Sequence, residues 1–184
     1  RRADVCVLVV DAGEGLTEQD VKIIGYVHEQ GKPSVVVMNK WDTVEKDTHT
    51  IEKFEKKLRD DLKFMDYFKS VYISAKTGQR VDRVLALAEE AFAHANFRVA
   101  TGELNDLLMD AMRVSEPPSY QGRRLKLYFA SQVAVCPPLF VLMVNDEDLM
   151  HFSYERYLEN TIRGAYDFSG TPIRIQVRNN KEQS

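Results

Sequence analysis

Three short apolar runs, each followed by polar or glycine-containing residues, constrain the fold of this chain most strongly. Residues 5–10 read VCVLVV, residues 34–38 read SVVVM and residues 70–74 read SVYIS. Continuous runs of this kind are typical of parallel strands that are buried on both faces. Amphipathic segments at residues 17–30, 51–62 and 81–95 separate and follow them, and we predict these to be helices. The alternation predicts an α/β fold, a parallel sheet with flanking helices.

The pattern changes after residue 98. We predict a helix from Thr101 to the residues before Pro117, strands at 124–135 and 139–144, a helix to residue 165 with Ser153 as its N-cap, and a strand at 173–178. The loop between the two middle strands is too short for a parallel crossover. We therefore predict a small α+β module of order α-β-β-α-β, and two domains that span residues 1–98 and 99–184.

Charge and cysteine content exclude several classes of protein. The formal net charge is −3, and residues 99–184 carry 9 Lys and Arg against 11 Asp and Glu, so autonomous binding to nucleic acid is disfavoured. Cys6 and Cys136 lie far apart in apolar runs, as expected of core thiols in a reducing cytoplasm. No apolar run is long enough to span a membrane. The chain opens on Arg1 and enters a strand almost at once, so we expect a piece of a longer protein.

The first candidate site, Asn39-Lys40-Trp41-Asp42, directly follows a predicted buried strand. A carboxylate such as Asp42 can accept from the N1–H and N2 amino groups of guanine at once, whereas adenine has no donor at N1. Asn39 can bond the O6/N7 edge of the base or tie the loop to neighbouring backbone, and Lys40 can lay its alkyl stem over the base. The alternative is a plain strand-end turn in which Asn39 and Asp42 act as caps.

The second candidate site, Ser74-Ala75-Lys76-Thr77-Gly78, follows the next predicted strand. Carboxyl ends of neighbouring parallel strands share one edge of a sheet, so we expect Ser74, Ala75 and Lys76 to lie beside the first site. There the Ala75 N–H can donate to guanine O6. An ordinary strand-to-helix turn with a permissive Gly78 is the alternative, but two such motifs in this order favour a guanine site.

These motifs, with Val9-Val10-Asp11-Ala12 and the segment from Gly13 to Asp20, resemble the second GTPase domain of the Der (EngA) family. Gly122 to Tyr128, Cys136 to Val141, His151 to Asn160 and Gly170 to Arg174 resemble the KH-like domain of that family. The resemblance covers residues 1–180. It implies a partial P-loop GTPase-type sheet, GTP or GDP as ligand with Mg²⁺ in the complete domain, GTP hydrolysis by the parent protein, and assembly of the large ribosomal subunit. It further implies a bacterial, cytoplasmic monomer that contacts the ribosome and its rRNA.

The sequence contains no G-x-x-x-x-G-K-[ST] phosphate loop. Asp11-Ala12-Gly13-Glu14 ends in glutamate and lies downstream of the family's D-x-x-G segment, so we do not assign it to the γ-phosphate. We therefore expect no catalytic residue and no metal ligand in this chain. We predict that it binds guanine nucleotide weakly and does not hydrolyse it.

The second module also lacks the G-x-x-G loop with which KH domains clamp RNA. Arg123, Arg124 and Lys126 form its main basic cluster, which is either an RNA or ribosome contact or a solvated strand edge. We expect the module to act mainly as a docking surface. Two other functions stay open: a KH-like adaptor without nucleotide function, and an unrelated flavodoxin-like or nucleotide enzyme.

Overall fold

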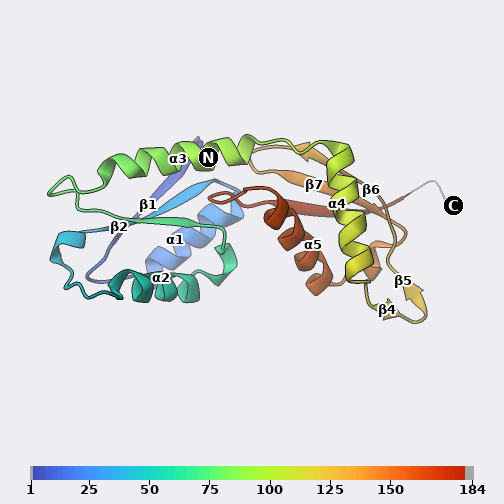
Figure 1. Cartoon of the computed structure of the whole chain (residues 1–184), viewed down its shortest axis with the longest axis horizontal. Coiled ribbons are helices and arrows are strands. Elements are labelled where there is room, and N and C mark those ends of the chain that lie inside the picture. Colours follow the sequence, from blue (N-terminus) through green and yellow to red (C-terminus); the bar gives the residue numbers. More distant parts are fainter. Residues whose placement is uncertain (1, 181–184) are drawn as a thin grey trace. The chain divides into compact units, whose positions relative to one another are not determined.

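The computed structural model describes residues 2–180, and these form two compact units (Figure 1). The first comprises the chain up to Ala95 together with Phe168–Pro172. The second comprises Asn96–Asp167 and the chain from Ile173 onward. The predicted domain bounds, residues 1–98 and 99–184, stay a prediction.

The first unit contains the predicted parallel sheet. Its strands are β1 (Cys6–Asp11), β2 (Ser34–Asn39) and β3 (Lys69–Tyr72), in the order β1-β2-β3. The first five residues of β2 are buried, because the central strand is covered on both faces. In this register Asp11 lies beside Asn39, so the carboxyl ends of β1 and β2 are level. The α/β fold predicted from the sequence is confirmed.

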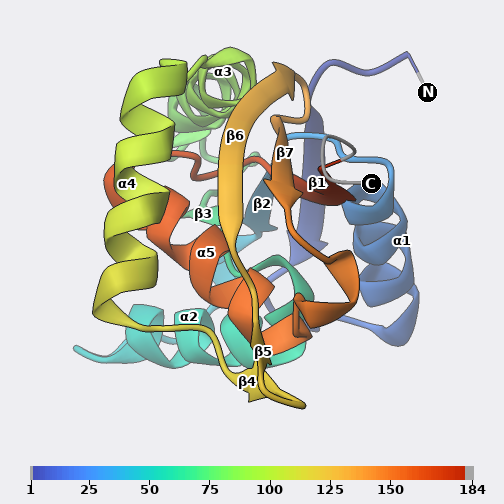
Figure 2. The same cartoon turned by 90° about the vertical axis from the view of Figure 1, so that its right-hand side faces the viewer.

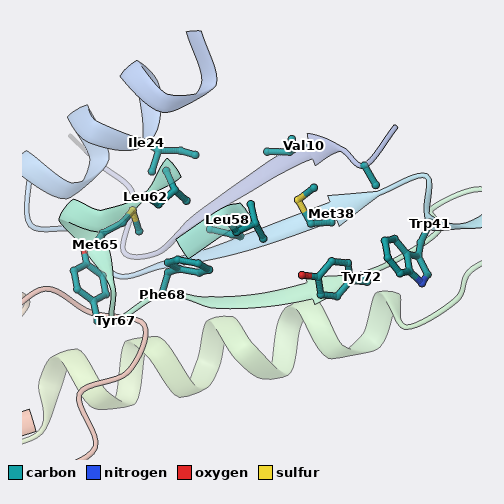
Figure 3. Packing of buried hydrophobic residues seen from close by; sticks show 12 residues of the cluster. Val10, Ile24, Met38, Trp41, Leu58, Leu62, Met65, Tyr67, Phe68 and Tyr72 are labelled. Atoms are coloured by element: carbon teal, nitrogen blue, oxygen red, sulfur yellow. The ribbon is translucent and has the colours of Figure 1, made fainter. Parts of the chain in front are cut away.

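Helices cover both faces of β2 and β3, whereas β1 is exposed on one face, where Val7 and Val9 are 42% and 59% exposed. The expectation that the first apolar run is buried on both faces is therefore wrong. One face of the sheet is covered by α1 (Glu18–Glu29) and α2 (Thr50–Asp61), together with two short 3₁₀ helices, η1 (Trp41–Thr43) and η2 (Lys63–Met65). The hydrophobic core on this face includes Ile24, Met38 and Phe68 (Figure 3). On the other face Leu87 of α3 (Val81–Asn96) packs against β2 and β3. Thr17, where the predicted helical segment begins, caps α1 and forms a capping box with Asp20.

Residues 168–172 belong to the first unit although they lie far along the chain from the rest of it. The Ser34 N–H donates to the Gly170 carbonyl at 2.8 Å, and the Gly170 N–H donates to the Tyr67 carbonyl at 2.8 Å. The side chain of Phe168 is 1% exposed and Thr171 is buried. This segment therefore accepts the hydrogen bond from the first backbone N–H of β2, that of Ser34.

The second unit has the predicted α-β-β-α-β order. Helix α4 (Thr101–Val114) is followed by β6 (Leu127–Ala134), β7 (Leu139–Val144), α5 (Phe152–Ala165) and β8 (Arg174–Asn179). β6 pairs antiparallel with β7, and β7 pairs parallel with β8. Helix α4 contacts both β6 and α5 (Figure 2). The small α+β module predicted from the sequence is thus confirmed.

Two local predictions in the second unit are wrong. The strand expected at 124–135 is too long: β6 begins only at Leu127, and Arg124 belongs to β5 (Arg123–Arg124), which pairs with β4 (Ser119–Tyr120). Gln121 and Gly122, with φ angles of 50° and 75°, form the turn of this short hairpin. Ser153 is not the N-cap of α5. His151 occupies that position with an extended backbone, and Ser153 lies within the first turn. A third 3₁₀ helix, η3 (Glu147–Leu149), precedes α5.

Among residues 2–180 there is no helix with both the length and the apolar character that a membrane span requires.

Candidate functional site

The structure brings the two predicted motifs together. Beyond the end of β3 the Ile73 N–H donates to the Met38 carbonyl at 2.9 Å, and the Trp41 N–H donates to the Ile73 carbonyl at 2.9 Å. The ladder between β2 and β3 thus continues into both loops. Asn39, Lys40 and Asp42 therefore lie beside Ser74, Ala75 and Lys76 on one rim of the sheet, as expected for neighbouring parallel strands.

Asp42 is exposed, while the neighbouring Ser74 is fully buried. A hydrogen bond from the Ser74 side chain lowers the pKa of Asp42, and attraction from Lys76 and Lys46 lowers this pKa further. Ser74 also accepts from the Thr77 N–H at 3.2 Å, which fixes its rotamer. These interactions favour the anionic form of Asp42, and a carboxylate is the group that a paired N1–H and N2 donor requires.

Asn39 ties the two loops together. Its Oδ1 accepts from the Ala75 N–H at 3.0 Å, the second of the two roles considered from the sequence. The Ala75 N–H, expected to face guanine O6, therefore has a partner within the protein. Because Oδ1 is occupied in this way, the amide Nδ2 is the end of Asn39 that can donate to the acceptors O6 and N7 of a base.

Asp11, the last residue of β1, joins this site. Its Oδ2 lies 2.5 Å from Lys40 Nζ, and its Oδ1 accepts from the Gly13 N–H at 2.8 Å. The contact with Lys40 lowers the pKa of Asp11 and raises the pKa of Lys40. A signal was present in the sequence, because Asp11 follows the first strand as Asn39 follows the second.

The buried side chain of Trp41 fixes the loop after β2 to the hydrophobic core. This side chain is 2% exposed and packs against Tyr72, with ring centroids 4.6 Å apart (Figure 3). Phe54 packs against it edge-on, with a centroid distance of 5.1 Å. Lys46 Nζ lies 5.6 Å from the Trp41 ring centroid. The large ring of Trp41 thus holds the backbone between Lys40 and Asp42 against the core.

A cavity of about 290 Å³ lies nearby, between the loop after β1 and α2, and Gly13, Leu16, Phe54 and Lys57 are among its lining residues. None of the six predicted base-binding residues lines it. The candidate base site is therefore an open rim rather than this cavity. Within residues 2–180 no group of three or more His, Cys, Asp or Glu side chains is placed to hold a metal ion.

The basic cluster of the second unit is largely paired. Arg123 lies 2.8 Å from Asp146, and Arg124 forms an ion pair with Glu116. The backbone N–H of Lys126 donates to Asn145 Oδ1 at 2.7 Å, and its side chain is exposed. Intramolecular carboxylates thus offset two of the three positive charges, so the cluster is a weaker phosphate-binding surface than its sequence indicates.

Comparisons with known proteins agree with this architecture. Residues 1–113 match the Elongation factor Tu GTP binding domain, and residues 98–178 match the KH-domain-like region of EngA bacterial GTPase enzymes, C-terminal. The chain is 52% identical over 181 residues to GTPase Der of Clostridium tetani and 50% identical over 182 residues to GTPase Der of Acetivibrio thermocellus.

These matches cover 98% and 99% of the chain but 41% of each relative, so the chain spans about two fifths of the length of those proteins. A solved structure of Era from Aquifex aeolicus aligns with 96% of this chain and 65% of its own, at 15% identity and a TM-score of 0.41. That likeness is too low to add to the argument. The two domain matches and the identity to GTPase Der over nearly the whole chain together show that it belongs to the Der (EngA) family of GTPases.

Proposed function

We propose that the rim formed by the loops after β2 and β3 reads the guanine base of GTP or GDP. Its residues are Asn39, Lys40, Asp42, Ser74, Ala75 and Lys76. Asp42 accepts from the N1–H and N2 groups of the base, and Asn39 donates through Nδ2 to its O6/N7 edge. The single observation that carries this proposal is the hydrogen bond from the Ala75 N–H to Asn39 Oδ1, which joins the two loops beside Asp42. Adenine has no donor at N1 and would leave the carboxylate partly unpaired, so the rim favours guanine.

Ala75 contributes in a second way to this proposal. Because its N–H already donates to Asn39, guanine O6 is recognised mainly by Asn39 Nδ2, with the Ala75 N–H shared between the two acceptors when a base is bound. The exposed Lys40 and Lys76 flank the rim and can cover the faces of the base with their alkyl stems.

We further propose that the protein containing this chain binds and hydrolyses GTP in the assembly of the large ribosomal subunit, as a cytoplasmic monomer. The name GTPase Der of the relatives and the family membership of the chain support this activity. The phosphates and Mg²⁺ require a phosphate loop, which this sequence does not contain. The 184-residue chain alone therefore binds GTP weakly and does not hydrolyse it. Micromolar affinity or measurable turnover of the chain would contradict this.

The base assignment is tested with Asp42→Asn. We expect the variant to weaken binding of GDP and to strengthen binding of xanthosine diphosphate, because an amide can donate to the carbonyl that xanthine carries at position 2. Titrations followed by NMR detect weak affinities of this kind. Asp106→Asn, an exposed carboxylate on α4, is the matched control. Equal affinity of the unmodified chain for GDP and ADP would reject the guanine site and favour the KH-like adaptor.

For the second unit we propose a docking role towards the ribosome or its RNA, with Arg123, Arg124 and Lys126 as the candidate contact. Charge reversal of all three to Glu should weaken binding to purified large-subunit particles. Arg156→Glu, an exposed arginine of α5, controls for a general loss of positive charge. Binding that survives the triple reversal would remove this cluster from the interface.

A further inference from the structure

Asp11 occupies a position from which it can control Lys40. It is the last residue of β1 and lies beside Asn39 in the parallel register, so its side chain stands at the same edge of the sheet as the base site. One carboxylate oxygen accepts from the Gly13 N–H at 2.8 Å, and the other lies 2.5 Å from Lys40 Nζ. The first contact orients the carboxylate towards the second.

The backbone of Lys40 is fixed independently of its side chain. Lys40 has φ 60° and ψ 34°, the left-handed conformation that non-glycine residues rarely adopt. The carbonyl of Asn39 accepts from the Ala12 N–H at 2.9 Å, and the carbonyl of Lys40 accepts from the Thr43 hydroxyl at 2.8 Å. The direction in which the Lys40 side chain leaves the loop is therefore set, and only its side-chain torsions stay to be ordered.

An exposed lysine normally samples many rotamers, and ordering it costs conformational entropy. The Lys40 side chain is 60% exposed, so packing alone does not immobilise it, whereas the partner carboxylate of Asp11 is 23% exposed and held by Gly13. The ion pair fixes the far end of the lysine to a rigid part of the sheet. The alkyl stem between the fixed backbone and the fixed ammonium is then ordered before a ligand arrives.

We infer that Asp11 is a positioning residue of the guanine site, which orders the Lys40 side chain and thereby raises nucleotide affinity without choosing the base. The inference rests on the proposed function, because it requires Lys40 to contact the nucleotide. Base choice stays with Asp42, which belongs to a different strand end and has its own partner in Ser74.

The experiment is a double-mutant cycle of Asp11→Ala and Lys40→Ala in the 184-residue chain, with affinities for GDP and ADP measured by NMR titration. We expect Asp11→Ala to weaken GDP binding about fivefold to tenfold and to leave the ratio of GDP to ADP affinities unchanged. In the Lys40→Ala background, Asp11→Ala should change GDP affinity by less than about twofold, because the residue that it positions is gone.

Glu90→Ala is the matched control, since Glu90 forms an exposed ion pair with Lys69 at the opposite end of the sheet, 3.1 Å between Nζ and Oε2. It should leave GDP affinity unchanged. Asp11→Asn keeps an acceptor for the Gly13 N–H, so it serves if Asp11→Ala disturbs the fold, and it too should weaken GDP binding.

Three outcomes separate the possibilities. Unchanged GDP affinity in Asp11→Ala and Asp11→Asn would overturn the positioning role while leaving the guanine site intact. An equal loss of affinity with and without Lys40 would also overturn it, because the effect would then be on the loop in general. An absence of GDP preference in the unmodified chain would instead reject the proposed function itself.

Discussion

Asn39 Oδ1 accepts the backbone N–H of Ala75 at 3.0 Å and so joins the loop after β2 to the loop after β3. The bond crosses 36 positions of sequence, and a single side chain makes it. Asn39→Ala should speed hydrogen exchange at the Ala75 amide about twofold to tenfold, as expected for a hydrogen bond worth about 0.5–1.5 kcal/mol. The Trp41 amide, which donates to the Ile73 carbonyl, is the internal control and should be unchanged.

Asn39→Asp separates the two roles that we assign to this side chain. The aspartate keeps an acceptor for the Ala75 N–H, so protection of that amide should persist. It loses the Nδ2 donor and places an anion at the O6/N7 edge, so GDP affinity should fall at least as far as in Asn39→Ala. Full GDP affinity in Asn39→Asp would show that Nδ2 does not read the base.

Gly170 is required where residues 168–172 pack into the first unit. It has φ +80°, and a Cβ at this position would lie 2.7 Å from Ala91 Cβ and 3.3 Å from Ala91 Cα. Gly170→Ala combines backbone strain with a clash against a helix, so it should lower the free energy of unfolding by about 2–4 kcal/mol. Urea denaturation of the chain measures this change.

Gly164→Ala is the control for that experiment. Gly164 lies in α5, a Cβ at this position would meet no heavy atom within 4 Å beyond its chain neighbours and the backbone of its own helix, and its φ is not positive. Alanine should raise stability by about 0.5–1 kcal/mol, because glycine within a helix is unfavourable. A loss of stability of similar size in both variants would contradict the requirement for glycine at position 170.

The parallel sheet was predictable because each strand is an uninterrupted apolar run. The carboxyl ends of β2 and β3 were predictable too, because the polar residues Asn39 and Ser74 end these runs. The contact of Asp11 with Lys40 was not predictable. It depends on the parallel register and on the left-handed backbone of Lys40, neither of which a pattern of residue types specifies.

The placement of residues 168–172 was unpredictable for a related reason. Their bonds to Ser34 and Tyr67 are made by backbone atoms, which leave no trace in side-chain periodicity. Gly170 is the one residue of this segment whose type is consistent with close packing against another part of the chain, and a single glycine in a sequence does not identify such a contact. The wrong N-cap of α5 has a local cause: Ser153 suits a cap, but the chain is already helical from Phe152.

Asn105 makes a two-ended contact between α4 and β6. Its Oδ1 accepts from the Ala130 N–H at 2.8 Å, and its Nδ2 donates to the Ala130 carbonyl at 2.8 Å. Ala130 is fully buried, so Asn105→Ala leaves two polar backbone groups without these partners. We expect a loss of about 2–4 kcal/mol in the free energy of unfolding, measured with urea. The exposed Asn160→Ala should change it by less than about 0.5 kcal/mol.

The loop before α2 should make stability depend on pH in acid. Bonds from Lys53, the His49 N–H and the Thr50 hydroxyl lower the pKa of Asp47 from 3.8 to about 2. Since the folded-state pKa is depressed, the stabilisation is complete above pH 3.8 and is lost as pH falls towards about 2. Thermal unfolding should therefore show Asp47→Asn less stable than the unmodified chain at about pH 6, and the difference should vanish near pH 2.

Lys53 is the largest cause of that shift, since its Nζ lies 2.8 Å from Asp47 Oδ2. In a Lys53→Met background the effect of Asp47→Asn at about pH 6 should be smaller, and its disappearance on acidification should move to higher pH. Because the pair is exposed, salt at about 1 M should reduce the difference in the unmodified background as well. A difference between the unmodified chain and the Asp47→Asn variant that stays constant from about pH 6 to about pH 2 would show that the carboxylate charge plays no part in stabilising this loop.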